Sequence, residues 1–184
     1  AGALPREGAN VAPPRRDAIR VAFVGQAGAA AGGAERTLAT HLAFAPRDLA
    51  PTAILFEDGA FGDELRRLPI PVEIVRAPES VTSSRRERPR IEAVPQLCGH
   101  AAHLARRLRH LRIDVVYGNT MKANFTCALA ARLAAIPCVM HFHDIVDGML
   151  LQALRLTARF GSVERVACAR AVADALNLDR TTVS

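Results

Sequence analysis

The chain has 184 residues, half of them apolar, and a formal net charge of +6. This length can bury the core of one medium-sized domain, and no stretch approaches the 18 or more uncharged apolar residues of a membrane span, so we expect a soluble protein. Four widely spaced cysteines, without a CxxC pair or a Cys/His cluster at zinc spacing, favour reduced thiols in a cytoplasmic protein over a disulfide framework or a metal site.

The first 17 residues carry charges and prolines where a signal peptide would have an apolar stretch. We therefore predict that residues 1–17 are a disordered lead-in and that the folded domain covers residues 18–184.

Beyond the lead-in, short apolar runs of strand length alternate with segments of helical period. The predicted strands cover residues 19–24, 52–56, 71–75, 114–118, 137–142, 165–169 and 181–184. The predicted helices cover residues 33–44, 94–111, 121–136 and 169–178. This alternation predicts an α/β fold, a doubly wound and mainly parallel sheet of Rossmann-like βαβ units, whose ligands bind at the carboxyl ends of the strands.

A glycine-rich turn, GQAGAAAGGAERTL, follows the first predicted strand at residues 25–38. It lacks the GK[ST] ending of a Walker A loop, and its glycine spacing departs from the G-x-G-x-x-G dinucleotide fingerprint, although Glu57 resembles a ribose-binding acid. At a helix start, Gly32 and Gly33 would expose backbone N–H groups that suit an anion such as a diphosphate. The alternative is a flexible turn that needs small residues for packing.

Basic residues cluster between residues 82 and 112, a segment that contains eight arginines and only two glutamates. The segment contains no Phe or Trp to interleave with its arginines, which argues against a nucleic-acid surface. We expect either a peripheral contact with an anionic membrane or acidic acceptor, or a solvated helix face preceded by a mobile loop over residues 77–90.

A set of motifs in a fixed order resembles the N-terminal half of a GT-B glycosyltransferase of family 4. These motifs are RVAFVG, GGAER at the first helix, DVVYGNT, PCVMHFHD and RVACARAVADAL. The resemblance covers residues 18–184 and implies an acceptor-side domain whose donor domain is absent. It implies transfer of a sugar, with retention and without a metal or cofactor, from a nucleotide diphosphate donor to an unknown acceptor hydroxyl. We expect this part alone to be inactive.

Carried over by residue, the resemblance implies that Gly32 and Gly33 approach the donor diphosphate, together with Glu35. For Glu35, a favourable charge at a helix N-terminus is an equally good explanation. His143 matches the family histidine that hydrogen-bonds the donor sugar, and we treat it as the catalytic candidate. His141, two residues earlier on the same side of an extended segment, is its rival.

Four polar residues are candidates for acceptor binding: Asn119, Thr120, Lys122 and Asp144. Asn119 and Thr120 could instead cap the following helix. Ala169 stands where the family often has a serine, and neighbouring Arg170 is a candidate substitute. The competing function is a non-catalytic Rossmann-like module that binds a nucleotide or a partner, and a dinucleotide oxidoreductase ranks third because of the glycine spacing.

Overall fold

The computed structural model describes most of the chain. The described residues are 14–26, 32–79, 93–145, 148, 151–152, 156, 163–176 and 182–183. Most of the predicted lead-in and most of the predicted mobile loop lie outside these residues.

The described residues form seven strands that belong to one sheet. The strands are β1 (Ile19–Gly25), β2 (Leu49–Leu55), β3 (Val72–Ile74), β4 (Val115–Gly118), β5 (Cys138–Phe142), β6 (Val163–Ala167) and β7 (Thr182–Val183). The helices are α1 (Gly33–Ala43), α2 (Ala60–Leu65), α4 (Ala93–His110), α5 (Met121–Ala134) and α7 (Arg170–Leu176).

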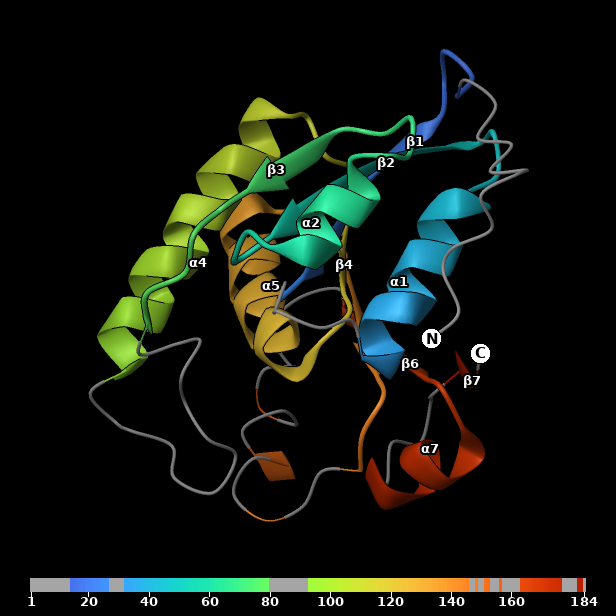
Figure 1. Ribbon diagram of the computed structural model, residues 1–184. Coiled ribbons are helices and arrows are strands. Elements are labelled where there is room, and N and C mark those ends of the chain that lie inside the picture. Colours follow the sequence, from blue (N-terminus) through green and yellow to red (C-terminus); the bar gives the residue numbers. More distant parts are fainter. Residues whose placement is uncertain are drawn as a thin grey trace.

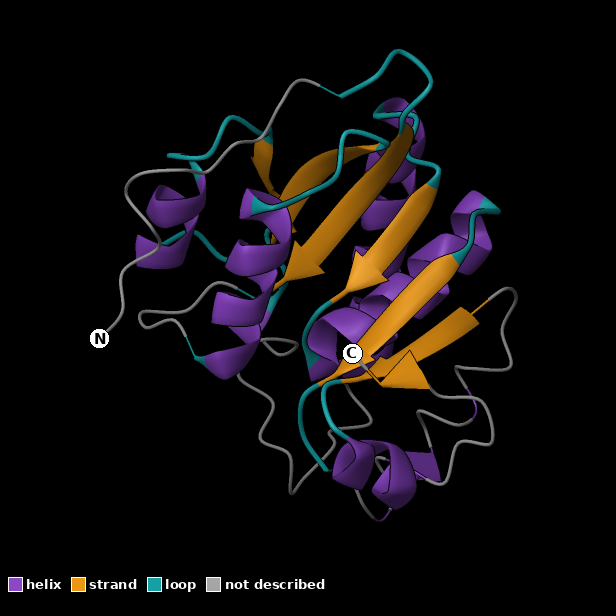
Figure 2. Cartoon of the chain, turned by 90° about the vertical axis from the view of Figure 1, so that its right-hand side faces the viewer, coloured by secondary structure: helices purple, strands orange, loops and turns teal. Residues whose placement is uncertain are grey.

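The strands are ordered β3-β2-β1-β4-β5-β6-β7, and every neighbouring pair is parallel. This confirms the predicted doubly wound α/β fold. α1 lies on one side of the sheet and α4 and α5 on the other, as Figure 1 shows. Figure 2 shows the strands side by side between these layers. The two faces follow from right-handed crossovers, because the chain moves one way from β1 and the opposite way from β3.

Each face of the sheet has its own apolar core. Leu38 and Leu42 of α1 pack with Phe61 and Leu65 of α2 against one face. On the other face, Leu104 and Leu108 of α4 and the alanines of α5 pack against β1, β4 and β5. The apolar stripe predicted for α4 is buried from Ala101 to Leu108, whereas Val94 in its first turn is 53% exposed.

Three differences between the structure and the predicted elements bear on the fold; among the smaller ones, β6 covers Val163–Ala167 rather than residues 165–169. α2 was not predicted, because its six residues are too few to show a helical period, yet its Phe61 and Leu65 are buried. β2 begins at Leu49 rather than at residue 52 and includes Pro51. A proline is tolerated there because β3 pairs only with residues 53–55 and leaves that side of β2 unpaired.

The third difference concerns the predicted lead-in. The backbone N–H of Arg15 donates to the carbonyl of Arg47 at 3.0 Å, and its guanidinium lies 3.2 Å from the Asp48 carboxylate. The described chain is therefore attached to the domain a few residues before the predicted start at Ala18.

The four cysteines are free thiols. Cys127 and Cys138 are buried, and burial raises the pKa of both thiols, whereas Cys98 is exposed. None of the described helices is long and apolar enough to cross a membrane.

Gly118, the last residue of β4, allows α5 to approach the sheet closely. A Cβ atom at this position would lie 2.5 Å from Oδ1 of Asn124 and 3.1 Å from its Cα. We expect Gly118→Ala to lower the free energy of unfolding by about 1–3 kcal/mol, because the backbone of α5 would have to move. Urea denaturation measures the change.

Gly99→Ala is the matched control. A Cβ at Gly99, inside α4, meets no described atom within 4 Å, so alanine should stabilise that helix by roughly 0.5–1 kcal/mol. Equal effects of the two substitutions would contradict the close approach at Gly118.

His100 of α4 is a buried titratable group in the core, 5% exposed. Its ring packs edge-on against Phe56, and its Nε2 atom has no hydrogen-bond partner among the described residues. Burial, together with His103, lowers its pKa to about 4. The unfolded chain therefore binds one proton more than the folded chain between pH 6.5 and 4. Stability from this residue is present above pH 6.5 and decreases by about 3 kcal/mol as the pH falls to 4.

We expect His100→Leu to remove this contribution to the loss of stability in acid. The free energy of unfolding is measured by urea denaturation at pH 7 and pH 4.5. His110→Leu, on an exposed position of the same helix, should leave the loss unchanged. An identical pH dependence for the His100 variant and the unsubstituted protein would show that His100 does not titrate with a depressed pKa.

Candidate functional site

The sheet reverses its winding between β1 and β4, which are neighbours in space. In a doubly wound sheet, ligands bind in the crevice outside the carboxyl ends of strands at such a point. Three segments meet there: the N-terminus of α1, the residues that follow β4, and the residues that follow β5.

At the start of α1, Gly32 is the N-cap residue and its backbone N–H donates to Oε2 of Glu35 at 2.9 Å. Glu35 thus has the capping role that its position at a helix N-terminus predicts, and its contact with a donor stays a prediction. Gly33 is exposed, and a Cβ there would meet no described atom within 4 Å. Packing against the described residues therefore does not require Gly33 to be glycine, and an approaching group has room there. Residues 27–31 of the turn lie outside the described residues.

His143 directly follows β5 and is half-buried. Its Nε2 atom lies 3.1 Å from Oδ1 of Asn119, and its backbone carbonyl accepts a long hydrogen bond of 3.6 Å from Sγ of Cys168. Burial lowers the pKa of His143, while the Asp144 and Glu35 carboxylates act in the opposite direction. The imidazole is therefore neutral at pH 7.

His141, the rival candidate, is 1% exposed. Its Nδ1 atom lies 2.5 Å from the Tyr117 hydroxyl, and its carbonyl accepts a hydrogen bond from Nδ2 of Asn124 at 2.9 Å. Burial and the neighbouring His143 and His41 lower its pKa to about 4. This geometry gives His141 a packing role and supports His143 as the histidine that meets a ligand, which itself stays a prediction.

A third histidine, His41 of α1, completes an aromatic cluster on this face of the sheet. Its ring is stacked on that of His141, with centroids 6.0 Å apart, and the rings of His141 and His143 are 4.0 Å apart. Tyr117 lies edge-on to both His41 and His141. His41 and Tyr117 were not predicted to belong to the site. The available signal was a histidine next to the buried Leu42 on the helix that opens with GGAER.

Asn119 is fully buried. Its Nδ2 atom donates to the carbonyl of Ala34 in α1 at 2.7 Å, and its Oδ1 faces His143. Both polar atoms of the side chain have partners inside the chain, so in this structure Asn119 connects α1 with His143. Thr120 is the N-cap of α5, and its Oγ1 accepts a 3.4 Å hydrogen bond from the backbone N–H of Ala123. The predicted capping is therefore observed for Thr120, and acceptor contacts remain predictions for both residues.

Lys122 and Asp144 also lie at the carboxyl edge of the sheet. Lys122 is half-buried in the first turn of α5, and burial lowers its pKa while Glu57 raises it. Glu57, after β2, also accepts a 3.4 Å hydrogen bond from Nε2 of Gln26. Gln26 was not predicted to belong to the site. Asp144 is exposed beside His143.

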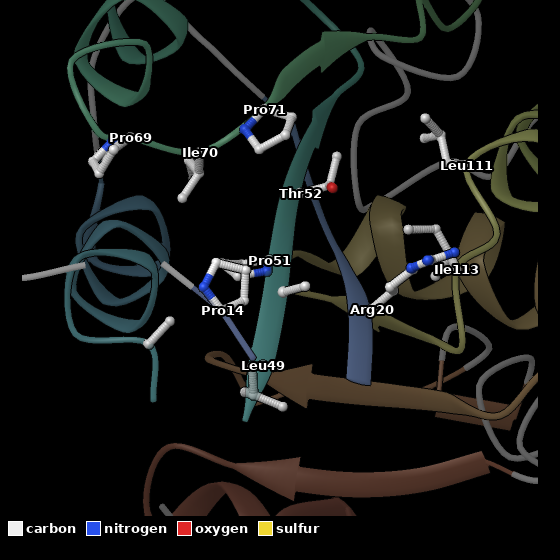
Figure 3. A pocket seen from close by; sticks show the side chains of 12 residues that line it. Pro14, Arg20, Leu49, Pro51, Thr52, Pro69, Ile70, Pro71, Leu111 and Ile113 are labelled. Atoms are coloured by element: carbon white, nitrogen blue, oxygen red, sulfur yellow. The ribbon is translucent and has the colours of Figure 1, made fainter. Parts of the chain in front are cut away.

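Two hollows lie near the sheet edges. An open hollow of about 340 Å³ at the carboxyl ends of β2 and β3 is lined by Phe56, Glu57, Asp58, Arg76, Ala77 and Glu79. A second hollow, of about 280 Å³ and mostly apolar, lies at the opposite edge. Figure 3 shows it around the start of β2, with Pro69 and Pro71 on one side and Leu111 and Ile113 on the other. The first hollow includes Glu57, which accepts a hydrogen bond from Gln26 and acts on the charge of Lys122.

Arg170, the candidate substitute for a family serine, is the exposed first residue of α7. Its neighbour Cys168 contacts His143, which places the start of α7 close to the site. Within the described part of the chain, no three His, Cys, Asp or Glu side chains are grouped so that they could hold a metal ion.

Solved structures of glycosyltransferases share this fold. HepE from Anabaena, crystallised with UDP-glucose, has a TM-score of 0.68 and 27% sequence identity over 90% of this chain and 43% of its own. MurG from Acinetobacter baumannii (TM-score 0.58, 17% identity) and the lipopolysaccharide outer core galactosyltransferase WaaB (0.61, 12%) match in fold. The match to MurG covers 90% of this chain and 45% of MurG, and the match to WaaB covers 86% of this chain and 42% of WaaB.

The chain thus spans less than half the length of these structures and corresponds to the N-terminal half of the GT-B fold. A search of curated protein sequences finds no match. The family model described as Glycosyltransferase Family 4 matches residues 31–177, which include α1, the candidate site and α7. The chain therefore belongs to glycosyltransferase family 4.

Proposed function

We propose that this chain is the acceptor-side half of a retaining glycosyltransferase that transfers a sugar from a nucleotide diphosphate to an acceptor hydroxyl. The observation that carries the proposal is the meeting of His143, Asn119 and the N-terminus of α1 at the reversal of the sheet. HepE, which shares this half of the fold, was crystallised with UDP and with UDP-glucose, which supports a nucleotide sugar as the donor.

In this reaction the bond between the sugar C1 and the diphosphate oxygen breaks, and its electrons remain on the diphosphate. The acceptor oxygen forms the new bond to C1 on the same face, and its proton passes to the departing diphosphate. The departing diphosphate gains negative charge, so N–H groups in the first turn of α1, beginning at Gly33, would stabilise the transition state more than the ground state. No cofactor other than the nucleotide sugar takes part in the proposal.

In the described structure the backbone N–H of Gly32 already donates a hydrogen bond to the Glu35 carboxylate. A diphosphate that used this N–H would displace the carboxylate, and repulsion between the two anions would favour a rotated Glu35. The more open N–H groups of the first turn need no such change, so we assign the first diphosphate contact to Gly33.

His143 is the residue that we expect to contact the donor sugar. In the full-length enzyme, His143→Ala should lower kcat by about tenfold or more, which corresponds to one lost hydrogen bond that orients the sugar. The melting temperature should change little, because the ring is only half-buried. The assay follows release of the nucleotide diphosphate from a panel of nucleotide sugars that includes UDP-glucose.

His110→Ala, on the exposed end of α4, is the control and should leave kcat unchanged. Unaltered turnover in the His143 variant would remove this residue from the proposal, and loss of folding would assign it to the core. If the unsubstituted enzyme transfers no sugar while the chain binds a free nucleotide tightly, the non-catalytic module replaces the transferase.

We also propose that the arginine-rich segment, residues 82–112, draws the enzyme to an anionic membrane surface. Arg85, Arg86, Arg88 and Arg90 lie outside the described residues. On α4, Arg106 and Arg109 are exposed, whereas Arg107 is paired with Glu73 through contacts of 2.6 and 2.7 Å. Its charge is largely compensated, so the attraction rests on the other arginines.

Sedimentation with vesicles tests the membrane contact. We expect binding to vesicles that contain anionic lipid and none to neutral ones, since each basic residue gains about 1 kcal/mol at an anionic surface. Replacing Arg85, Arg86, Arg88 and Arg90 by serine should abolish it. A control with the same charge change replaces four exposed arginines elsewhere: Arg16, Arg47, Arg67 and Arg132. Equal loss in both variants would indicate a general charge effect rather than a surface at this segment.

A further inference from the structure

Asn119 connects the parts of the candidate site. It directly follows β4, its backbone N–H donates to the carbonyl of Val24 in β1 at 2.9 Å, and its side chain is fully buried. We propose that Asn119 is a positioning residue, which holds the imidazole of His143 with its proton on Nε2 and thereby presents Nδ1 as a hydrogen-bond acceptor to a sugar hydroxyl. The sugar rests on the proposed function, whereas the position of the proton does not.

The orientation of the Asn119 amide follows from its partner on α1. A backbone carbonyl can only accept a hydrogen bond, so the atom that lies 2.7 Å from the Ala34 oxygen must be the NH₂ group of the amide. The other atom of the amide, which faces His143 at 3.1 Å, is therefore the oxygen. Exchanging the two would place two oxygens against each other in a buried position.

The amide oxygen in turn determines the imidazole. It can only accept, so Nε2 of His143 must carry a proton. Because the neutral ring holds a single proton, Nδ1 then has a free lone pair. No hydrogen bond is formed by Nδ1 within the described part of the chain. A hydroxyl group of a sugar can donate to this atom, whereas an imidazole of the opposite tautomer would meet the hydroxyl as a donor.

The neutral state depends on the groups that face the ring from several elements. Glu35 and His41 come from α1, His141 from β5, and Asp144 from the segment after β5. Burial and His41 oppose the imidazolium, and the two carboxylates favour it. A carboxylate in the place of the Asn119 amide would also favour the imidazolium. The pH dependence of activity is therefore a sensitive measure of this contact.

The same amide ties His143 to the donor side of the site. Ala34, which receives its NH₂ group, is the second residue of α1 and adjoins Gly33. One side chain therefore sets the distance between the first turn of α1 and the imidazole. Without the Asn119 side chain, neither the tautomer of His143 nor this distance would be held in place.

The tautomer can be measured without substrate. In the full-length protein labelled with ¹⁵N in its histidines, long-range ¹H–¹⁵N correlation at pH 7.5 should show His143 with a protonated Nε2 and an unprotonated Nδ1. Its signals are assigned by their absence in His143→Gln. A protonated Nδ1, or averaged shifts at both nitrogens, would overturn the inference whatever the variants do.

Asn119→Ala should move the two ¹⁵N shifts of His143 toward averaged values and lower kcat/KM for the nucleotide sugar by about tenfold. Asn124→Ala is the matched control, because Asn124 is equally buried and donates to the carbonyl of His141. It should cost similar stability and leave the shifts of His143 unchanged. An unchanged tautomer in the Asn119 variant, or the same change in both variants, would contradict the positioning role.

Asn119→Asp separates the role from a general loss of structure. Its carboxylate can still accept from Nε2 but stabilises the imidazolium, so the pH at which activity falls on the acid side should rise by about one unit or more. An unmoved acid limb would overturn the inference. If the unsubstituted enzyme transfers no sugar, the proposed function fails by itself, and the ¹⁵N measurement still decides the position of the proton.

Discussion

The site depends on the pairing of β1 with both β2 and β4. Because β1 lies inside the sheet, the chain can wind in one direction from it and in the opposite direction from β4. The helix after β1 therefore lies on one face and the helix after β4 on the other, and doubly wound sheets bind ligands between the starts of two such helices. Backbone hydrogen bonds extend this order beyond the strands, since the N–H of Asn119 still pairs with Val24. The parallel pairing thus positions the first polar residue of the site.

Burial then determines the chemistry that these residues can perform. Tyr117, His141 and Asn119 lie among apolar neighbours, where a charge would be costly and each polar atom needs a partner. His141 meets this requirement through Tyr117, and His143 through Asn119. The outcome is a set of neutral imidazoles, of which His141 is buried and His41 and His143 are partly exposed. A neutral ring can accept a hydrogen bond from a hydroxyl group.

Glycine serves two different purposes in this half of the fold. At Gly118 the backbone and amide of Asn124 come so close that no side chain fits, and the glycine is a packing requirement. At Gly33 there is open space, and the bare backbone leaves N–H groups of a helix start accessible. Both residues lie at the same edge of the sheet. The first brings α5 against β4, and the second leaves room for an anion.

The sequence by itself determined the class of fold, because apolar runs and helical periods are local patterns that the parallel sheet requires. It also placed Gly32 and Gly33 at a helix start and His143 at a strand end, and ordered motifs indicated family 4. The roles of Asn119, His41 and Tyr117 were decided only by the tertiary structure. Asn119 contacts Ala34, 85 positions away, and His143, 24 positions away, and the direction of its amide depends on both. No local pattern records such distant contacts, so the partners of Asn119 could not be predicted until the strands were paired.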